Sequence, residues 1–189
     1  MLKPKMETQT DRNLQSDRIT WFSMWFLGSV ASFGAGFFPM YYRLVDSRNR
    51  HFRREAGWEL RIAKFVEKQG KLPMQLSEPP HDRNAKAWAA SIIVIIPVFL
   101  ILYYLSRDLA EHERHQDKFL AEAFPQPMFM TQTIPIKKYV LITIATLGVG
   151  SVYWLYKIVN SYNAHFKAQW QLEIEISRLM EEKQVGRFM

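Results

Sequence analysis

The chain has 189 residues, no cysteine, and 25 Lys and Arg against 18 Asp and Glu, so its formal net charge is +7. This length fits one modest domain, and the lack of cysteine excludes disulfides and thiolate metal sites. The mean hydropathy is slightly negative. The apolar residues are nevertheless gathered into blocks, so the chain-wide mean conceals a strongly segregated sequence.

A polar N-terminal tail precedes the first apolar block. The three blocks cover residues 19–45, 87–105 and 139–156. Each comes close to the roughly 20 apolar residues that cross a ~30 Å hydrocarbon core as a helix. Aromatic pairs such as Tyr41 and Tyr42 lie near the block ends, which is typical of membrane interfaces. The sequence therefore predicts an all-α integral membrane protein with three transmembrane helices.

Basic residues predict the orientation of these helices. The densest run follows the first block directly and contains Arg43, Arg48, Arg50, Arg53 and Arg54. Because Lys and Arg concentrate on the inner side, the N-terminus is expected outside and the C-terminus inside, in a cell membrane. The run is also expected to bind anionic lipid headgroups. Its position beside a predicted span favours lipid over nucleic acid.

A long internal match indicates duplication. The polar motif Y[RK]xVxSxNxHF[RK] occurs at residues 42–53 and again at 156–167, within a longer similarity that begins near residue 29. Two copies that are separated by one further span point the same way, which makes a parallel repeat. Beyond each span an apolar stripe follows helical spacing. We expect two inner helices, at 46–69 and 159–184, that meet through Ile62 and Ile176.

The predicted organisation follows from the repeat. It comprises a tail (1–18), copy one with its inner helix (19–70), a linker (71–86), the second transmembrane helix with a polar helix (87–123), a Pro-containing loop (124–138) and copy two (139–189). Residues 103–112 echo the motif only faintly, so the sequence predicts two copies.

Small residues recur at helix-contact spacing in both copies. Gly28, Ser32 and Gly36 lie four residues apart, as do Thr146 and Gly150. Such faces allow helix backbones to approach closely, so we expect the two copies to meet there. The predicted packing residues are Gly28, Ser32, Gly34, Gly36, Thr146, Gly148 and Gly150.

Residues 146–166 read TLGVGSVYWLYKIVNSYNAHF. This stretch resembles a family of small, uncharacterised multi-pass membrane proteins, a domain of unknown function. The family's hallmark is similar to TLGxYxxYWLYK followed by a short helix with an Asn or His. The resemblance covers about one seventh of the chain strongly and the first copy loosely. It implies a helical membrane fold and supplies no activity.

Histidines are the candidate ligands. His51 and His165 occupy equivalent repeat positions and could bind a haem or a metal, or make polar contacts with headgroups or a partner helix. His112 and His115 have a spacing that could chelate zinc or copper, although a charged, solvated helix has the same pattern.

Known catalytic motifs do not occur. The sequence contains no phosphate loop, dinucleotide fingerprint, HExxH or GxSxG. The leading prediction is a non-catalytic accessory or scaffold subunit of a larger membrane assembly, with lipids and other membrane subunits as partners and no cofactor. The alternative is a haem- or metal-binding membrane redox component using His51, His165, His112 and His115.

Overall fold

The computed structural model describes residues 16–70, 74, 76, 80–93, 95–124 and 134–185. Most of the predicted tail and of the Pro-containing loop lies outside these residues, as do residues 71–73, 75 and 77–79 of the predicted linker. The described residues form helices and no strand, so the all-α part of the prediction is confirmed. The helices are α2 (Phe22–Ala31), α3 (Phe37–Lys68), α4 (Ala85–Ala90), the 3₁₀ helix η1 (Ser91–Ile93), α5 (Ile95–Ala123), α6 (Ile136–Ala145) and α7 (Gly150–Val185).

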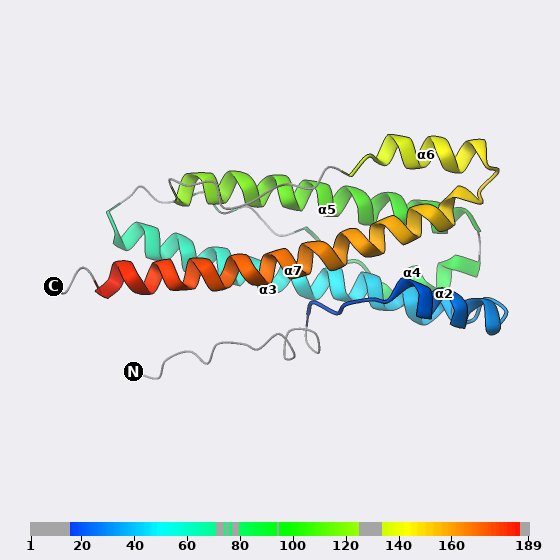
Figure 1. Ribbon diagram of the computed structural model, residues 1–189, viewed down its shortest axis with the longest axis horizontal. Helices are drawn as coiled ribbons and strands as arrows, with labels where there is room; N and C mark the ends of the chain where they lie inside the picture. Colours follow the sequence, from blue (N-terminus) through cyan, green and yellow to red (C-terminus); the bar gives the residue numbers. More distant parts are fainter. Residues whose placement is uncertain are drawn as a thin grey trace.

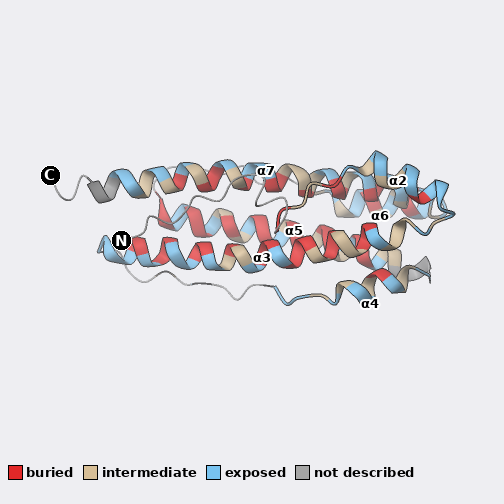
Figure 2. Cartoon of the chain, turned by 90° about the horizontal axis from the view of Figure 1, so that it is seen from below, coloured by how far each residue is buried: buried red, intermediate tan, exposed pale blue. Residues whose placement is uncertain are grey.

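Three long helices, α3, α5 and α7, lie side by side and run in the same direction (Figure 1). The short helices gather at the end where the long helices begin. There α2 contacts α3 and α7, α6 contacts α7 and α5, and α4 contacts α3. Buried positions follow the sides of the long helices that face one another (Figure 2). The architecture is thus a parallel three-helix bundle with short helices around one end.

The long helices meet through buried residues spaced alternately four and three apart, as in a left-handed coiled coil. The positions on α3 are Leu44, Arg48, His51, Glu55, Trp58 and Ile62. The positions on α5 are Leu105, Leu109, His112, Gln116, Phe119 and Ala123. The positions on α7 are Ile158, Tyr162, His165, Gln169, Leu172 and Ile176. Ile62 and Ile176 belong to one apolar cluster, which also contains Trp58 and Phe119.

A polar segment divides the core into two apolar clusters. One cluster lies toward the short helices and includes Leu44, Leu105 and Ile158. The other lies toward the far end and includes Phe119 and Leu172. The buried histidines and their polar partners fall between the two, so the surrounding apolar layers keep them from water.

The predicted membrane spans do not form. Turns at residues 32–36 and 146–149 interrupt the first and third apolar blocks, and the second block is shared among α4, η1 and α5. Within the described ranges, no helix combines the length with the apolar character that crossing a membrane requires. The prediction of a multi-pass integral membrane protein with three spans and an N-outside orientation is therefore wrong.

Both interrupting turns have the same backbone geometry. Phe33 and Leu147 have φ angles of 52° and 50°, and Gly34 and Gly148 follow with φ angles of 93° and 97°. This left-handed region favours glycine, because a Cβ atom there meets the backbone. Two consecutive left-handed residues reverse the chain, so each apolar block folds into a helical hairpin instead of a continuous helix.

A hydroxyl group closes each turn. The Ser32 hydroxyl donates to the Gly28 carbonyl at 2.7 Å and accepts a hydrogen bond from the Gly36 N–H at 2.9 Å. Thr146 makes the same pair of bonds, with the carbonyl of Ile142 and the N–H of Gly150. The Ser and Thr at these equivalent positions therefore pair the Gly36 and Gly150 N–H groups, which the start of the next helix leaves without a carbonyl partner.

The predicted packing glycines lie within their own hairpins. A Cβ atom on Gly36 would stand 2.8 Å from Ser29, and one on Gly150 would stand 2.8 Å from the Thr146 hydroxyl and 2.9 Å from the Ile142 carbonyl. A Cβ atom on Gly28 or Gly34 would meet no atom within 4 Å. Gly36 and Gly150 thus allow the two arms of one hairpin to approach closely.

The asparagines of the repeat motif hold the segments in front of the short helices. The side-chain amide of Asn163 bonds both the N–H and the carbonyl of Thr20, at 2.9 and 2.8 Å. Asn49 does the same for Arg83, at 3.1 and 2.7 Å. Each asparagine therefore fixes the entry to α2 or α4 against a neighbouring long helix.

Gly150→Ala is expected to lower the free energy of unfolding by about 1–3 kcal/mol, because its new methyl group collides with the opposite arm of the hairpin. Gly57→Ala is the matched control: a Cβ atom there meets nothing within 4 Å, and alanine favours the helix by up to about 1 kcal/mol. Chemical denaturation of both variants measures the difference. Equal stability changes would contradict this hairpin packing.

Candidate metal centre

Three imidazoles meet at the centre of the bundle. His51 comes from α3, His112 from α5 and His165 from α7. Their ring centroids lie 5.5, 5.0 and 5.1 Å apart, and each pair of ring planes is inclined by 78–80°. The Nε2 atoms of His51 and His165 are 3.0 Å apart. The parallel register of the helices thus places one histidine from each in a single layer.

A carboxylate completes the cluster. The Glu55 Oε2 atom lies 2.6 Å from His112 Nε2 and 3.4 Å from His51 Nε2. Ligand atoms of these three residues and His165 all lie within 4.8 Å of one another. The four side chains are at most 8% exposed. Despite their proximity, Glu55 Oε2 and His112 Nε2 make no hydrogen bond of acceptable geometry.

Two further carboxylates orient the imidazoles. Asp17 Oδ1 lies 2.8 Å from His51 Nδ1, and Glu113 Oε1 lies 3.2 Å from His165 Nδ1. A carboxylate on one ring nitrogen fixes the tautomer and the direction of the other nitrogen, as in many metal sites. The Nε2 atoms of His51 and His165 therefore face the centre of the cluster.

The next layer of the bundle holds Glu55 in place. It consists of Glu55, Gln116 and Gln169, each four residues after a cluster histidine. The side-chain amide of Gln116 donates to Glu55 Oε1 and also to the side-chain carbonyl of Gln169. One carboxylate oxygen of Glu55 is thus occupied by this layer, while the other faces the imidazoles.

Electrostatics favour the ligand forms of these groups. Burial alone would raise the pKa of Glu55, but His112 and His51 lower that pKa well below its ordinary value, so the carboxylate is ionised. Burial and the neighbouring imidazoles lower the pKa of His165 well below its ordinary value, so His165 is neutral. For His51, burial opposes the charge, yet Asp17 and Glu55 raise its pKa overall. A bound cation would displace that proton.

The donor set fits a transition metal. Zinc prefers four ligands drawn from imidazole nitrogen, carboxylate oxygen and thiolate, and three imidazoles with one carboxylate meet this requirement. Bonds of about 2.1 Å place tetrahedral donors about 3.4 Å apart. Three of the observed separations are 2.6, 3.0 and 3.4 Å, and all ligand atoms lie within 4.8 Å of one another, so the set spans this value. Imidazole-rich sites also accept other first-row ions.

The structure unites some of the predicted site residues and separates others. It brings His51 and His165 together and adds His112, whereas His115 lies outside the four-residue cluster.

The arginines that the sequence predicts to bind lipid headgroups do not form a free basic run, because each contacts another group of the same chain. Their partners are the Ile19 carbonyl for Arg43, Asp108 for Arg48, Asp46 for Arg50, Asp82 for Arg53, and Asp17 with Glu173 for Arg54.

Sequence reasoning did not identify Glu55, Asp17 or Glu113 as site residues. A recurring signal was present for Glu55, because His-x-x-x-(Glu/Gln) occurs three times, as HFRRE, HERHQ and HFKAQ. The middle occurrence lies on α5, at the end of the stretch that echoes the repeat motif. Asp17 has no such signal, since it lies 34 residues from the histidine that it contacts.

Comparison of the chain with protein families, curated proteins and solved structures found no match in any of the three. The resemblance of residues 146–166 to an uncharacterised membrane family therefore stays a prediction.

A buried ion pair borders the histidine layer on the side of the short helices. Arg48 is 1% exposed, and its guanidinium lies 3.0 Å from Asp108 Oδ2. Arg83 forms a bidentate pair with the same carboxylate, at 2.8 and 2.9 Å. Asp108 thus compensates the positive charges of two guanidinium groups next to the cluster.

Asp108→Asn is expected to lower the free energy of unfolding by about 3–5 kcal/mol, because it leaves the buried Arg48 charge uncompensated. Asp82→Asn removes an exposed ion pair with Arg53 and should change stability by less than about 1 kcal/mol. Urea denaturation at neutral pH compares the two variants. A loss at Asp108 no larger than at Asp82 would show that the buried pair does not contribute to stability.

Proposed function

We infer that this protein binds one divalent first-row transition-metal ion, with zinc as the best match, through His51, His112, His165 and Glu55. The observation that carries this proposal is the convergence of four buried ligand atoms within 4.8 Å. Three of these ligands come from three different helices. A bound ion would therefore tie α3, α5 and α7 together at the middle of the bundle.

The charge and ligand count support a structural role for the ion. Asp17, Glu55 and Glu113 bring carboxylates into contact with the imidazoles, and a divalent cation offsets part of this buried negative charge. Four protein donors fill a tetrahedral shell, which is the arrangement of structural zinc sites. Catalytic zinc sites keep one position open for water or substrate. We therefore propose a metal-stabilised helical module.

A haem fits the same residues less well. Two axial histidines must lie on opposite faces of a porphyrin. Here the Nε2 atoms of His51 and His165 are 3.0 Å apart, and His112 and Glu55 occupy the space around them. The role of accessory subunit in a larger assembly is compatible with a metal-stabilised module and stays a prediction.

The full-length protein, stripped with chelator and then incubated with Zn²⁺, is expected to retain about one ion per chain after gel filtration, measured by elemental analysis. His165→Ala and Glu55→Ala should lose the ion, because each removes one of four converging ligands. His115→Ala and His81→Ala should keep it, since neither residue belongs to the cluster. Absence of stoichiometric binding for Zn²⁺, Mn²⁺, Fe²⁺, Co²⁺, Ni²⁺ and Cu²⁺ would refute the proposal.

Glu113→Gln is expected to weaken Zn²⁺ binding about 10–100-fold, because it removes the carboxylate that orients His165. Glu111→Gln is the matched control, since its carboxylate lies two positions away on the same helix and is 60% exposed. Competition with a chromogenic chelator yields both dissociation constants. Equal constants for the two variants would remove Glu113 from the site.

A further inference from the structure

Large apolar side chains are exposed at one end of the molecule. This hairpin end consists of α2, η1, α6, the two turns at residues 32–36 and 146–149, and the adjoining starts of α3, α5 and α7. Phe33 and Leu147, at the tips of the turns, are almost completely exposed. Others exposed here are Met24, Leu27, Val30, Ile93, Leu141, Ile144 and Val149. An apolar patch of this kind marks an interaction surface.

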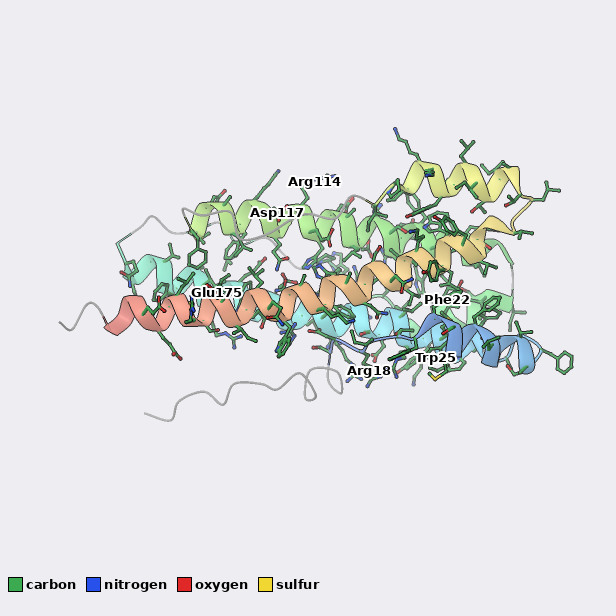
Figure 3. The ribbon with its side chains drawn as sticks, viewed as in Figure 1. Arg18, Phe22, Trp25, Arg114, Asp117 and Glu175 are labelled. Atoms are coloured by element: carbon green, nitrogen blue, oxygen red, sulfur yellow. The ribbon has the colours of Figure 1, made fainter. Side chains whose placement is uncertain are left out.

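The hairpin end carries no charged residue beyond its basic border. Residues 22–42 and 139–156 contain no Asp, Glu, Lys, Arg or His. Lys86, Lys137 and Lys138 are exposed where α4 and α6 begin, at the base of this end. Figure 3 shows Phe22 and Trp25 at the hairpin end, Arg18 beside its base, and Arg114, Asp117 and Glu175 on the opposite half of the molecule.

The exposed turns need no hydrogen bonds from their surroundings for their N–H groups. Each backbone N–H from Ser32 to Phe37 donates within its own hairpin, to carbonyls or to the Ser32 hydroxyl. Each N–H from Thr146 to Val152 likewise donates within its own hairpin: the Gly150 N–H bonds the Thr146 hydroxyl, and the others bond backbone carbonyls. In hydrocarbon, an unpaired amide costs several kcal/mol, so internally paired turns are suited to an apolar medium.

A cavity opens between the two hairpins. It has a volume of about 1060 Å³ and a predominantly apolar lining that includes Phe33, Phe37, Phe38, Ile93, Leu147 and Val152. Gly148 forms part of its wall, and a Cβ atom at this position would lie 3.6 Å from the Phe99 ring. An acyl chain has the shape and the chemistry to occupy such a space.

We propose that the hairpin end inserts into the acyl region of a single leaflet of a phospholipid bilayer, without crossing it. The ten residues of α2 or α6 span about 15 Å, which is half of a ~30 Å hydrocarbon core. Lys86, Lys137 and Lys138 then lie at the level of the headgroups, where anionic lipids attract basic side chains. This proposal does not depend on the metal centre.

A second protein chain is the competing occupant of this surface. A protein partner can supply acceptors for unpaired turn amides, whereas acyl chains cannot. The complete internal pairing of the N–H groups in both turns therefore favours lipid. The basic border of the hairpin end also favours lipid, because anionic headgroups attract basic side chains.

The first test is cosedimentation of the full-length chain with vesicles of phosphatidylcholine, with and without phosphatidylglycerol. Binding is expected, and it should strengthen with the anionic lipid. The double variant Phe33→Asn, Leu147→Asn should bind about 100-fold more weakly, because each exposed side chain contributes about a tenfold factor on leaving water. Asparagine tolerates the left-handed backbone at both sites, so the fold is retained. Leu60→Asn, an exposed apolar position on α3 outside the hairpin end, is the matched control and should bind as the parent does.

The second test uses the cysteine-free background. An environment-sensitive dye on Phe33→Cys or Leu147→Cys should shift to the blue with vesicles, while the same dye on Leu60→Cys should not. A quencher trapped in the vesicle lumen should leave all three labels unquenched. Three results would overturn the proposal: no vesicle binding, quenching from the lumen, or self-association of the free chain that the double variant abolishes.

Discussion

Burial of ionisable side chains in the middle of an apolar bundle constrains the rest of this structure. A carboxylate or imidazolium removed from water is costly unless other groups compensate it. Here Glu55 is held between imidazoles and the Gln116 amide, and His51 is held by Asp17. These contacts require α3, α5 and α7 to run parallel and in one register, since each contributes a histidine to the same layer. The apolar clusters on both sides keep water out and so strengthen every interaction within the layer.

Parallel long helices need connections between the end of one and the start of the next, and here these lead from α3 to α4 and from α5 to α6. Asn49 and Asn163 bind the backbone just before α4 and α2, so each entry point is fixed against a long helix. The same arrangement separates the two ends of the molecule chemically. The hairpin end exposes apolar side chains, whereas the charged residues Arg114, Asp117 and Glu175 lie on the opposite half (Figure 3). A metal at the centre and a lipid leaflet at the hairpin end would therefore act on different parts of one rigid framework.

The errors in the sequence interpretation have specific physical causes. Hydropathy sums apolar residues over a window, and a turn made of apolar residues does not lower that sum. Phe33 and Leu147 contribute as much to the predicted spans as helical residues would, although both have left-handed backbone angles. The sequence named His112 as a candidate ligand but did not align it with His51 and His165, because α5 shares few positions with the repeat motif. The similarity of α5 to α3 and α7 lies in the spacing of its buried residues, and that spacing is recognised only when all three helices are compared.

By itself, the sequence determined the helical class, the amphipathic helical stretches over 46–69 and 159–184, and the equivalence of His51 with His165, because each depends on local periodicity or on a repeated motif. Only the tertiary structure decided that the apolar blocks fold back on themselves, that His112 joins the other two histidines, and which carboxylates orient them. Asp17 and His51 are 34 residues apart, and His51 and His165 are 114 apart. Contacts over such separations arise from the packing of whole helices, which no local pattern encodes.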